Sequence, residues 1–347
     1  MIVAAPVQAR APQDPARTRR PPPLPTRPPS AEHPDLARWA ENVGAPLSLD
    51  WARPLPRGEV QGIDVLCWNL FIGAARLDQL LGLLRGGAWG GAGTDPRRPL
   101  VILAQEAYRS DASVPVRPLT RFFDAAVEPE GRTGIAEMAA THALSVRYAP
   151  SMRLGMAPRD KGNAILSTAA LGPMQTVVLP FVRQRRVAVG AELAGLPGLM
   201  LVSGHLDTRG AQRALGFWRG AISPFGEGRA AQARAMAAHF IEAAGQAGSV
   251  IIGADLNAPL GARDSAHREL VRAGFTPAKR IGPFGHTFHV PVRFPLDFVL
   301  YHSPTQRIRS VEVVRLDEEP EDRSRYVFGS DHHPLLARVS LAPAHVP

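Results

Sequence analysis

Polar and acidic side chains stand at the ends of apolar segments at several places in this 347-residue chain. In chain order these positions are Asn69, Glu106, His205, Asp255 with Asn257, Asp297, and Asp331 with His332. Carboxylate and amide oxygens are the ligands that Mg²⁺ or Mn²⁺ prefers. Histidines near carboxylates transfer protons or stabilise an oxyanion close to neutral pH. The set therefore indicates a hard divalent cation combined with acid–base chemistry.

Such dispersed residues can meet if the adjoining segments are strands that end or begin at one edge of a sheet. Strand-like apolar runs cover 63–70, 100–104, 162–168, 175–181, 186–193, 199–205, 249–254, 296–301, 308–314 and 335–341. Helical spacing marks 77–84 and 229–244. This mixture, which contains no repeat, predicts one α/β domain over 61–343. Ligands of layered α/β proteins collect at strand ends, where the polar residues lie.

The composition excludes several other classes of protein. Apolar residues make up 45% of the chain, so it is globular, and no apolar run is long enough for an integral membrane helix. One cysteine excludes an internal disulfide. The proline-rich residues 1–35 are predicted to be a disordered arm, and 36–60 a lead-in to the domain. Nothing in the pattern indicates oligomerisation.

The net charge of +9 favours an anionic partner, although only weakly, because arginine dominates a chain with two lysines, Lys161 and Lys279. The compartment stays open between cytoplasmic and exported. Ala9, Arg10 and Ala11 have the small-x-small form of a signal-cleavage site, but no charged segment precedes the short apolar run before them. This is either coincidence or the remainder of a truncated signal peptide.

Eight short motifs in a fixed order carry a resemblance to a known family. WN, QE, GNAIL, RVAVGAEL, SGHLD, GADLN, PLDFVLY and SDHHP resemble the endonuclease/exonuclease/phosphatase superfamily, which includes deoxyribonuclease I-like enzymes, and the likeness spans about 62 to 341. The last part, GADLN followed by LDFVLY and SDHHP, is the most specific. The resemblance implies a four-layered α/β sandwich with two packed mixed β-sheets flanked by helices. It also implies Mg²⁺-dependent attack of water on phosphorus.

The resemblance assigns the metal to the acidic residues. Glu106 and Asp331 match its acidic ligands, and Asn69 lies beside them as a ligand or a substrate contact. Asp255 and Asn257 match the pair that positions the attacking water and holds the phosphate. Chemistry alone supports this division, because a cation must neutralise the phosphate oxygens before an anionic nucleophile can approach.

The same resemblance assigns proton transfer to the histidines. His332 matches the histidine that contacts the scissile phosphate or moves a proton, and Asp297 matches its orienting carboxylate. His205 matches a second histidine that apurinic endonucleases replace with tyrosine, which disfavours that class. We expect His333 to be structural or solvent-facing, and we keep His286 and His289 as secondary candidates for lining the pocket.

The substrate is the least determined feature. A long loop over 208–228 combines cations with aromatics, including Arg209 and Trp218, which could hold phosphates, bases or a choline-like headgroup, or could form an ordinary packed loop. We interpret the chain as a phosphodiesterase or nuclease acting on nucleic acid. The alternative enzyme is a phosphatase or sphingomyelinase-type hydrolase acting on a small or lipid phosphate. The non-enzymatic alternative is an inactive binding scaffold.

Overall fold

The computed structural model describes residues 33–55, 60–208, 226–289, 293–318 and 326–342. These residues form two mixed β-sheets, one of eight strands and one of six. The first sheet has the order β1 (Leu47–Leu49), β4 (Ser145–Arg153), β5 (Asp160–Ser167), β3 (Leu100–Arg109), β2 (Gly62–Asn69), β14 (Leu335–Leu341), β13 (Ile308–Arg315) and β11 (Lys279–Arg280). The second has the order β10 (Thr276–Pro277), β12 (Asp297–His302), β9 (Ser249–Asp255), β8 (Leu199–His205), β7 (Val187–Glu192) and β6 (Gln175–Val178).

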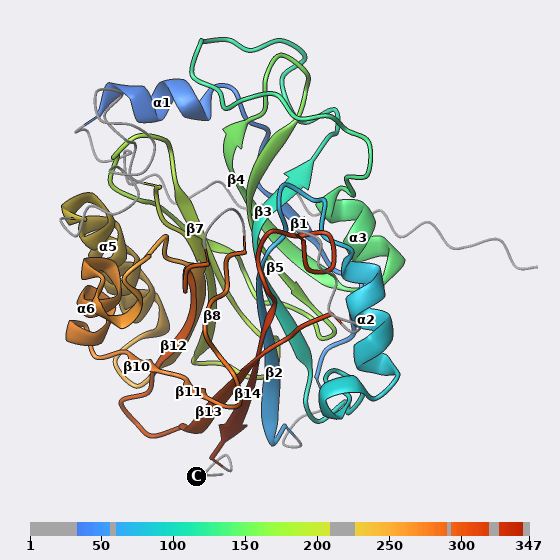
Figure 1. Cartoon of the computed structure of the whole chain (residues 1–347), viewed down its shortest axis with the longest axis vertical. Helices are drawn as coiled ribbons and strands as arrows, with labels where there is room; N and C mark the ends of the chain where they lie inside the picture. Colours follow the sequence, from blue (N-terminus) through green and yellow to red (C-terminus); the bar gives the residue numbers. More distant parts are fainter. Residues whose placement is uncertain (1–32, 56–59, 209–225, 290–292, 319–325, 343–347) are drawn as a thin grey trace, which may run out of the picture.

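Helices cover the outer faces of both sheets, so that the molecule has four layers (Figure 1). Helices α2 (Leu77–Arg85) and α3 (Ile135–Thr141) pack on the first sheet, while α5 (Glu227–Ala244) and α6 (Ser265–Arg272) pack on the second. The short helix α1 (Pro34–Ala40) lies near β4. The predicted α/β sandwich of two packed mixed sheets with flanking helices is confirmed.

The apolar runs become strands because both of their faces are buried. In β2, Ile63, Val65 and Cys67 belong to the core between the sheets, whereas Leu66 and Trp68 pack beneath the helices. Successive side chains of a strand point to opposite faces, so a strand with helices on one side and a second sheet on the other needs an unbroken apolar run. Because of the same alternation, a residue at the end of β2 that continues the series Ile63, Val65 and Cys67 also lies between the sheets.

Gly253 allows the two sheets to approach closely below this edge. A Cβ atom at this position would lie 2.7 Å from Leu103 Cδ1 and 3.0 Å from the Cβ of Cys67. Both neighbours belong to the first sheet, so any side chain at 253 would push the sheets apart. Glycine is therefore the residue that packing requires two positions before Asp255.

Strand β4 was not among the predicted strands, and its composition explains why. Arg147 and Arg153 interrupt the apolar pattern, yet both are buried. Arg147 donates to the carbonyl oxygens of Leu171 and Gly172, and Arg153 donates to those of Pro115 and Met156. These carbonyl oxygens take the place of water as acceptors for the guanidinium groups. A buried charged group that is fully hydrogen-bonded is tolerated in a strand, but a pattern of apolar residues does not reveal it.

The lead-in segment contributes structure of its own. β1 pairs with β4, and Leu36 and Trp39 of α1 are buried. Residues 1–32 of the predicted arm lie outside the described residues. Among the helices that the structure describes, none combines the length and apolarity needed to cross a bilayer.

Candidate active site

Three strands of the second sheet place chemistry-bearing side chains in one row. His205 of β8 is the register partner of Asp255 of β9, and Asp255 is the register partner of Asp297 of β12. All three continue the parity of the core residues that face the first sheet, such as Leu201, Ile251 and Val299. Cross-strand partners lie on the same face, so the row meets Asn69 and Glu106 of the first sheet at the inter-sheet crevice.

Asp255 is the residue that the others contact. Its Oδ2 lies 3.1 Å from Asn69 Nδ2, which donates to it, and 3.4 Å and 3.8 Å from the Nε2 atoms of His205 and His332. Oδ1 accepts the backbone N–H of Asn257 at 2.9 Å. Burial and the nearby charge of Asp297 raise the pKa of Asp255, although His332 opposes the increase. This carboxyl group therefore exchanges protons nearer to neutral pH than a surface aspartate does.

His332 is held in one orientation by Asp297. Its Nδ1 donates to Asp297 Oδ2 at 2.7 Å, which leaves Nε2 facing Asp255. Its backbone is fixed as well, because Trp68 Nε1 donates to the His332 carbonyl and Ser330 Oγ accepts the His332 N–H. Burial alone would lower the pKa of His332, but the carboxylate of Asp297 outweighs it and raises the pKa to about 10. The metal-free site therefore contains an imidazolium.

His205 has the opposite electrostatic environment. Burial, together with the positive charges of Arg186 and Lys161, holds the pKa of His205 well below its usual range. The depressed pKa favours the neutral imidazole, which can accept a hydrogen bond beside Asp255. The two histidines at the crevice thus differ in charge, which is the arrangement that divides acid from base roles.

Glu106 is aimed into the crevice by an irregularity of β3. The pairing of β3 with β5 shifts register between Ala104 and Ala107, and Glu106 has a positive φ of 50°. A bulge of this kind redirects a side chain but strains the backbone. Such strain is found mostly at functional sites. Glu106 Oε1 then lies 3.2 Å from Lys161 Nζ and 4.0 Å from His205 Nδ1.

The donor atoms at the crevice fit a hard divalent cation. Burial raises the pKa of Asp331 to about 6; His332 opposes this shift, while the charge of Glu106 adds to it. Two buried carboxylates repel each other, and a cation bound between them offsets this repulsion. In addition, Asp297 Oδ1 is buried and has no hydrogen-bond partner among the described residues. Asp255, Asp297 and His332 each offer one ligand atom within 4.8 Å of the others. Glu106 and Asp331, whose charges interact, would add oxygen donors for the ion.

Asn69 contacts Asp255 and the backbone of its own loop. Its Nδ2 donates to Asp255, and its Oδ1 accepts the backbone N–H of Phe71 at 3.0 Å. Both polar atoms are thus engaged within the protein, and the side chain positions Asp255. Asn257, which has a positive φ of 47°, donates from Nδ2 to the Leu206 carbonyl at 2.9 Å. Arg209 and Trp218 lie outside the described residues.

Sequence reasoning missed Lys161 and Asp124. Lys161 is buried on β5 between two carboxylates, those of Glu106 and of Asp124 at 3.0 Å. A signal was present, since Lys161 is one of two lysines and directly precedes GNAIL. Arg186, beside His205, was missed as well because it stood among several surface-like arginines at 183–186.

Comparisons with known proteins agree with this geometry. The profile of the Endonuclease/Exonuclease/phosphatase family matches residues 66–332. A search of curated protein sequences found no match.

Solved structures share the fold at low sequence identity. An endonuclease/exonuclease/phosphatase from Beutenbergia cavernae is 16% identical, with a TM-score of 0.53, over 83% of this chain and 73% of that one. One from Bacteroides vulgatus is 14% identical, with a TM-score of 0.53, over 81% and 99%. A family protein from Leptotrichia buccalis is 13% identical, with a TM-score of 0.50, over 81% and 99%.

Proposed function

The chain belongs to the endonuclease/exonuclease/phosphatase family of metal-dependent phosphoester hydrolases, and on that premise we propose that it is a Mg²⁺-dependent phosphodiesterase whose substrate is a nucleic acid. The observation that carries the proposal is the contact of Asp255 with both His205 and His332, while Asp297 holds His332. Mn²⁺ has the same ligand preference and is the expected substitute.

Asp255 is the group that receives the proton of the attacking water in this proposal. A general base works best when its pKa lies near the working pH, and burial raises the pKa of Asp255 in that direction. Asn69 and the backbone N–H of Asn257 hold its two oxygens in place. The water oxygen then bonds to phosphorus while the bond from phosphorus to the leaving oxygen breaks.

His332 holds the scissile phosphate as an imidazolium. The raised pKa makes it a poor base at neutral pH but a strong hydrogen-bond donor to an anionic oxygen. Its Nε2, the nitrogen that does not contact Asp297, is the donor. The proton that Asp255 receives is then released to the leaving oxygen or to solvent, while neutral His205 on the other side of Asp255 serves as a hydrogen-bond partner.

Glu106 and Asp331 would bind Mg²⁺ near the phosphate. When bound, the cation neutralises the non-bridging oxygens and stabilises the charge that develops on the leaving oxygen. Because its charge lowers the pKa of neighbouring acids, it also keeps Asp255 and Asp331 ionised at neutral pH. Lys161 remains beside Glu106 and adds positive charge at the same edge.

Three features favour a nucleic acid over a small phosphate monoester. Lys161 and Arg186 are buried beside His205 and add positive charge to this edge, which favours a polyanionic substrate. The half-buried ring of Phe288 lies 5.0 Å from that of His332 between centroids, where a base could stack on it. The chain's charge of +9 favours the same class of partner.

A substrate panel tests the proposal. The purified full chain is incubated with supercoiled DNA, RNA, sphingomyelin vesicles, an inositol phosphate and bis(p-nitrophenyl) phosphate, each with Mg²⁺ and with a chelator. We expect Mg²⁺-dependent cleavage of DNA or RNA and of the small diester. Exclusive cleavage of the lipid or of the inositol phosphate would reject the nucleic-acid assignment, and equal rates in chelator would reject the metal.

The variant Phe288→Ala separates substrate recognition from chemistry. If the ring stacks on a base, this change lowers kcat/KM for the nucleic acid by about 5- to 150-fold, since stacking contributes ~1–3 kcal/mol per base. Hydrolysis of bis(p-nitrophenyl) phosphate should be nearly unchanged. Equal losses on both substrates would show that Phe288 supports His332 instead of contacting the nucleic acid.

A further inference from the structure

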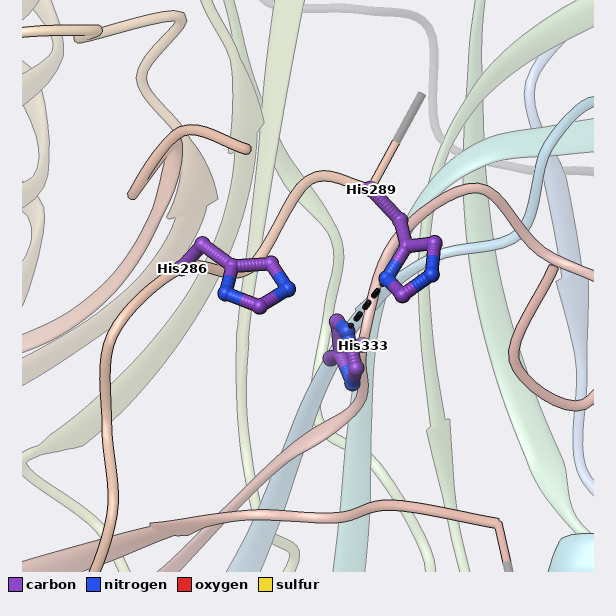
Figure 2. A group of neighbouring side chains, drawn as sticks. All are labelled: His286, His289 and His333. Carbon is purple, nitrogen blue, oxygen red and sulfur yellow. Dashed lines mark hydrogen bonds between the residues drawn. The ribbon is translucent and has the colours of Figure 1, made fainter. Parts of the chain in front are cut away.

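Three histidines from two distant segments form a cluster outside the site described above. His286 and His289 lie between β11 and β12, and His333 lies just before β14. One ring nitrogen of each histidine lies within 4.8 Å of the others (Figure 2). Three imidazoles this close together repel one another when all are protonated, and neutral imidazoles are ordinary ligands for a transition metal.

His333 is oriented with one nitrogen toward the cluster. Its Nδ1 lies 2.8 Å from Asp317 Oδ1, and its Nε2 lies 3.1 Å from His289 Nδ1. An imidazole that donates from one nitrogen to a carboxylate presents the lone pair of the other, as metal-bound histidines do. Asp317 thus fixes the tautomer of His333 that a metal requires.

His286 directs an unpartnered nitrogen toward the same point. Its Nε2 is buried and has no hydrogen-bond partner among the described residues. Figure 2 shows this ring facing the other two. Burial and the nearby positive groups, His333 and Arg315 first among them, lower the pKa of His286 to about 4, so it is uncharged. Arg315 Nη1 donates to the carbonyl of His286 at 3.0 Å and anchors this segment.

We propose that His286, His289 and His333 bind a divalent transition-metal ion, of which Zn²⁺ is the representative. The two nitrogens 3.1 Å apart are close to the ~3.4 Å expected between ligands of a tetrahedral ion with Zn–N distances of ~2.0–2.1 Å. The ion would replace the proton shared by His289 and His333. Three nitrogen ligands leave the fourth position for water, and they select against Mg²⁺, which prefers oxygen.

The ion would tie together the two segments that frame the active site. His289 N–H donates to the Asp331 carbonyl, and His333 N–H donates to the carbonyl of Thr287. Thr287 Oγ1 in turn accepts the backbone N–H of Asp297 at 2.9 Å. A metal at the histidine cluster would therefore rigidify the backbone that carries Asp331, His332 and Asp297 without contacting the substrate.

Co²⁺ is the probe that tests this proposal, because nitrogen-rich four-coordinate Co²⁺ absorbs visible light much more strongly than six-coordinate Co²⁺ with oxygen ligands. The full chain, stripped of metal, is titrated with Co²⁺ in excess Mg²⁺, which saturates the oxygen-donor site. We expect one equivalent of strongly absorbing Co²⁺, displaced by Zn²⁺. His286→Gln and His289→Gln should each weaken binding by about 100-fold or more, and Asp317→Asn by about 10–100-fold.

Three controls make the result decisive. His142→Gln, at the end of α3, and Asp297→Asn, in the active site, should leave the Co²⁺ spectrum unchanged. Thermal unfolding in chelator verifies that each variant is folded, and half-exposed Asp317 offers a mild substitution if a histidine variant is not. The proposal is rejected if strong absorption never develops, if it survives in the folded His286→Gln and His289→Gln variants, or if only Asp297→Asn removes it. It does not depend on the substrate of the enzyme.

Discussion

Asp255 and Asp297 are direct partners across neighbouring antiparallel strands, and the ring of His332 joins them, with Nδ1 2.7 Å from Asp297 and Nε2 3.8 Å from Asp255. Two buried acids on one face of a sheet would repel each other when both are ionised. The imidazolium offsets that repulsion. The register of β9 with β12 thus determines both the raised pKa of Asp255 and the charge of His332.

Removing either member of the His332 pair should impair catalysis strongly. We expect Asp297→Asn and His332→Ala each to lower kcat by roughly 10²–10⁴, the range for losing a positioned acid–base group. The double variant should be little worse than the worse single variant, because residues that act as a unit are not additive. Steady-state kinetics on bis(p-nitrophenyl) phosphate over a Mg²⁺ titration provide the measurement, with His142→Ala as the control. Unchanged turnover in His332→Ala would remove this histidine from the reaction.

Asp331 should lower the stability of the metal-free protein as pH rises through the acid range, whereas His205 and His286, whose pKa values are depressed by burial, contribute with the opposite sign. The folded pKa of Asp331, about 6, exceeds the ~3.9 of an unfolded aspartate, so the folded state binds the extra proton between these values. The free energy of unfolding therefore decreases by up to ~3 kcal/mol from about pH 4 to pH 6 through this group. Asp255, whose pKa is also raised, adds a contribution of the same sign.

Urea unfolding across this pH range, in chelator, measures the effect. Relative to Asp331→Asn, which carries no titrating group there, the natural chain should lose up to ~3 kcal/mol more between about pH 4 and pH 6. Excess Mg²⁺ at pH 7.5 should restore stability in the natural chain and much less in the variant. If the free energy of unfolding depends on pH identically in the two proteins, Asp331 is not a buried acid with a raised pKa.

Lys161 should stabilise the metal-free site by compensating its carboxylates. Lys161→Met leaves Glu106 and Asp124 without their cation, and we expect a loss of ~1–3 kcal/mol in the free energy of unfolding, below the ~3–5 kcal/mol of a fully buried pair because both acids are partly exposed. Added Mg²⁺ or Mn²⁺ should recover part of the loss. The matched control is Lys279→Met, since Lys279 pairs with Glu312 on the surface and should contribute less than ~1 kcal/mol. Equal losses in both variants would refute the special role of Lys161.

The close approach of the sheets at Gly253 gives a packing test. Gly253→Ala places a methyl group against Leu103 and Cys67, so we expect ~1–3 kcal/mol of destabilisation from overpacking and a loss of activity through displaced Asp255. Gly82→Ala in α2 is the opposite case, because nothing lies within 4 Å of the added Cβ and alanine favours the helix by up to ~1 kcal/mol. Denaturant unfolding of both variants measures these changes in the free energy of unfolding. A neutral Gly253→Ala would mean that the sheets adjust freely at this level.

Several features of the protein were determined by the sequence itself. Apolar runs such as 249–254 indicated strands buried on both faces, and their length and order predicted the α/β sandwich. The polar residue at the end of each run identified Asn69, Asp255 and Asp297 as one set, because strand ends meet at the edge of a sheet. These properties depend on residues that are neighbours in the chain, so the sequence pattern predicts them.

Tertiary structure alone decided how those residues divide their roles. Packing gives His205 and His332 opposite pKa shifts, because burial and the charges of Arg186 and Lys161 act on His205 while the carboxylate of Asp297 acts on His332. Lys161 reaches Glu106 only through the pairing of β5 with β3. Burial and the charge of a distant neighbour set each of these properties, and both depend on packing between segments far apart in the chain. For the same reason no local pattern could show that His286, His289 and His333 meet.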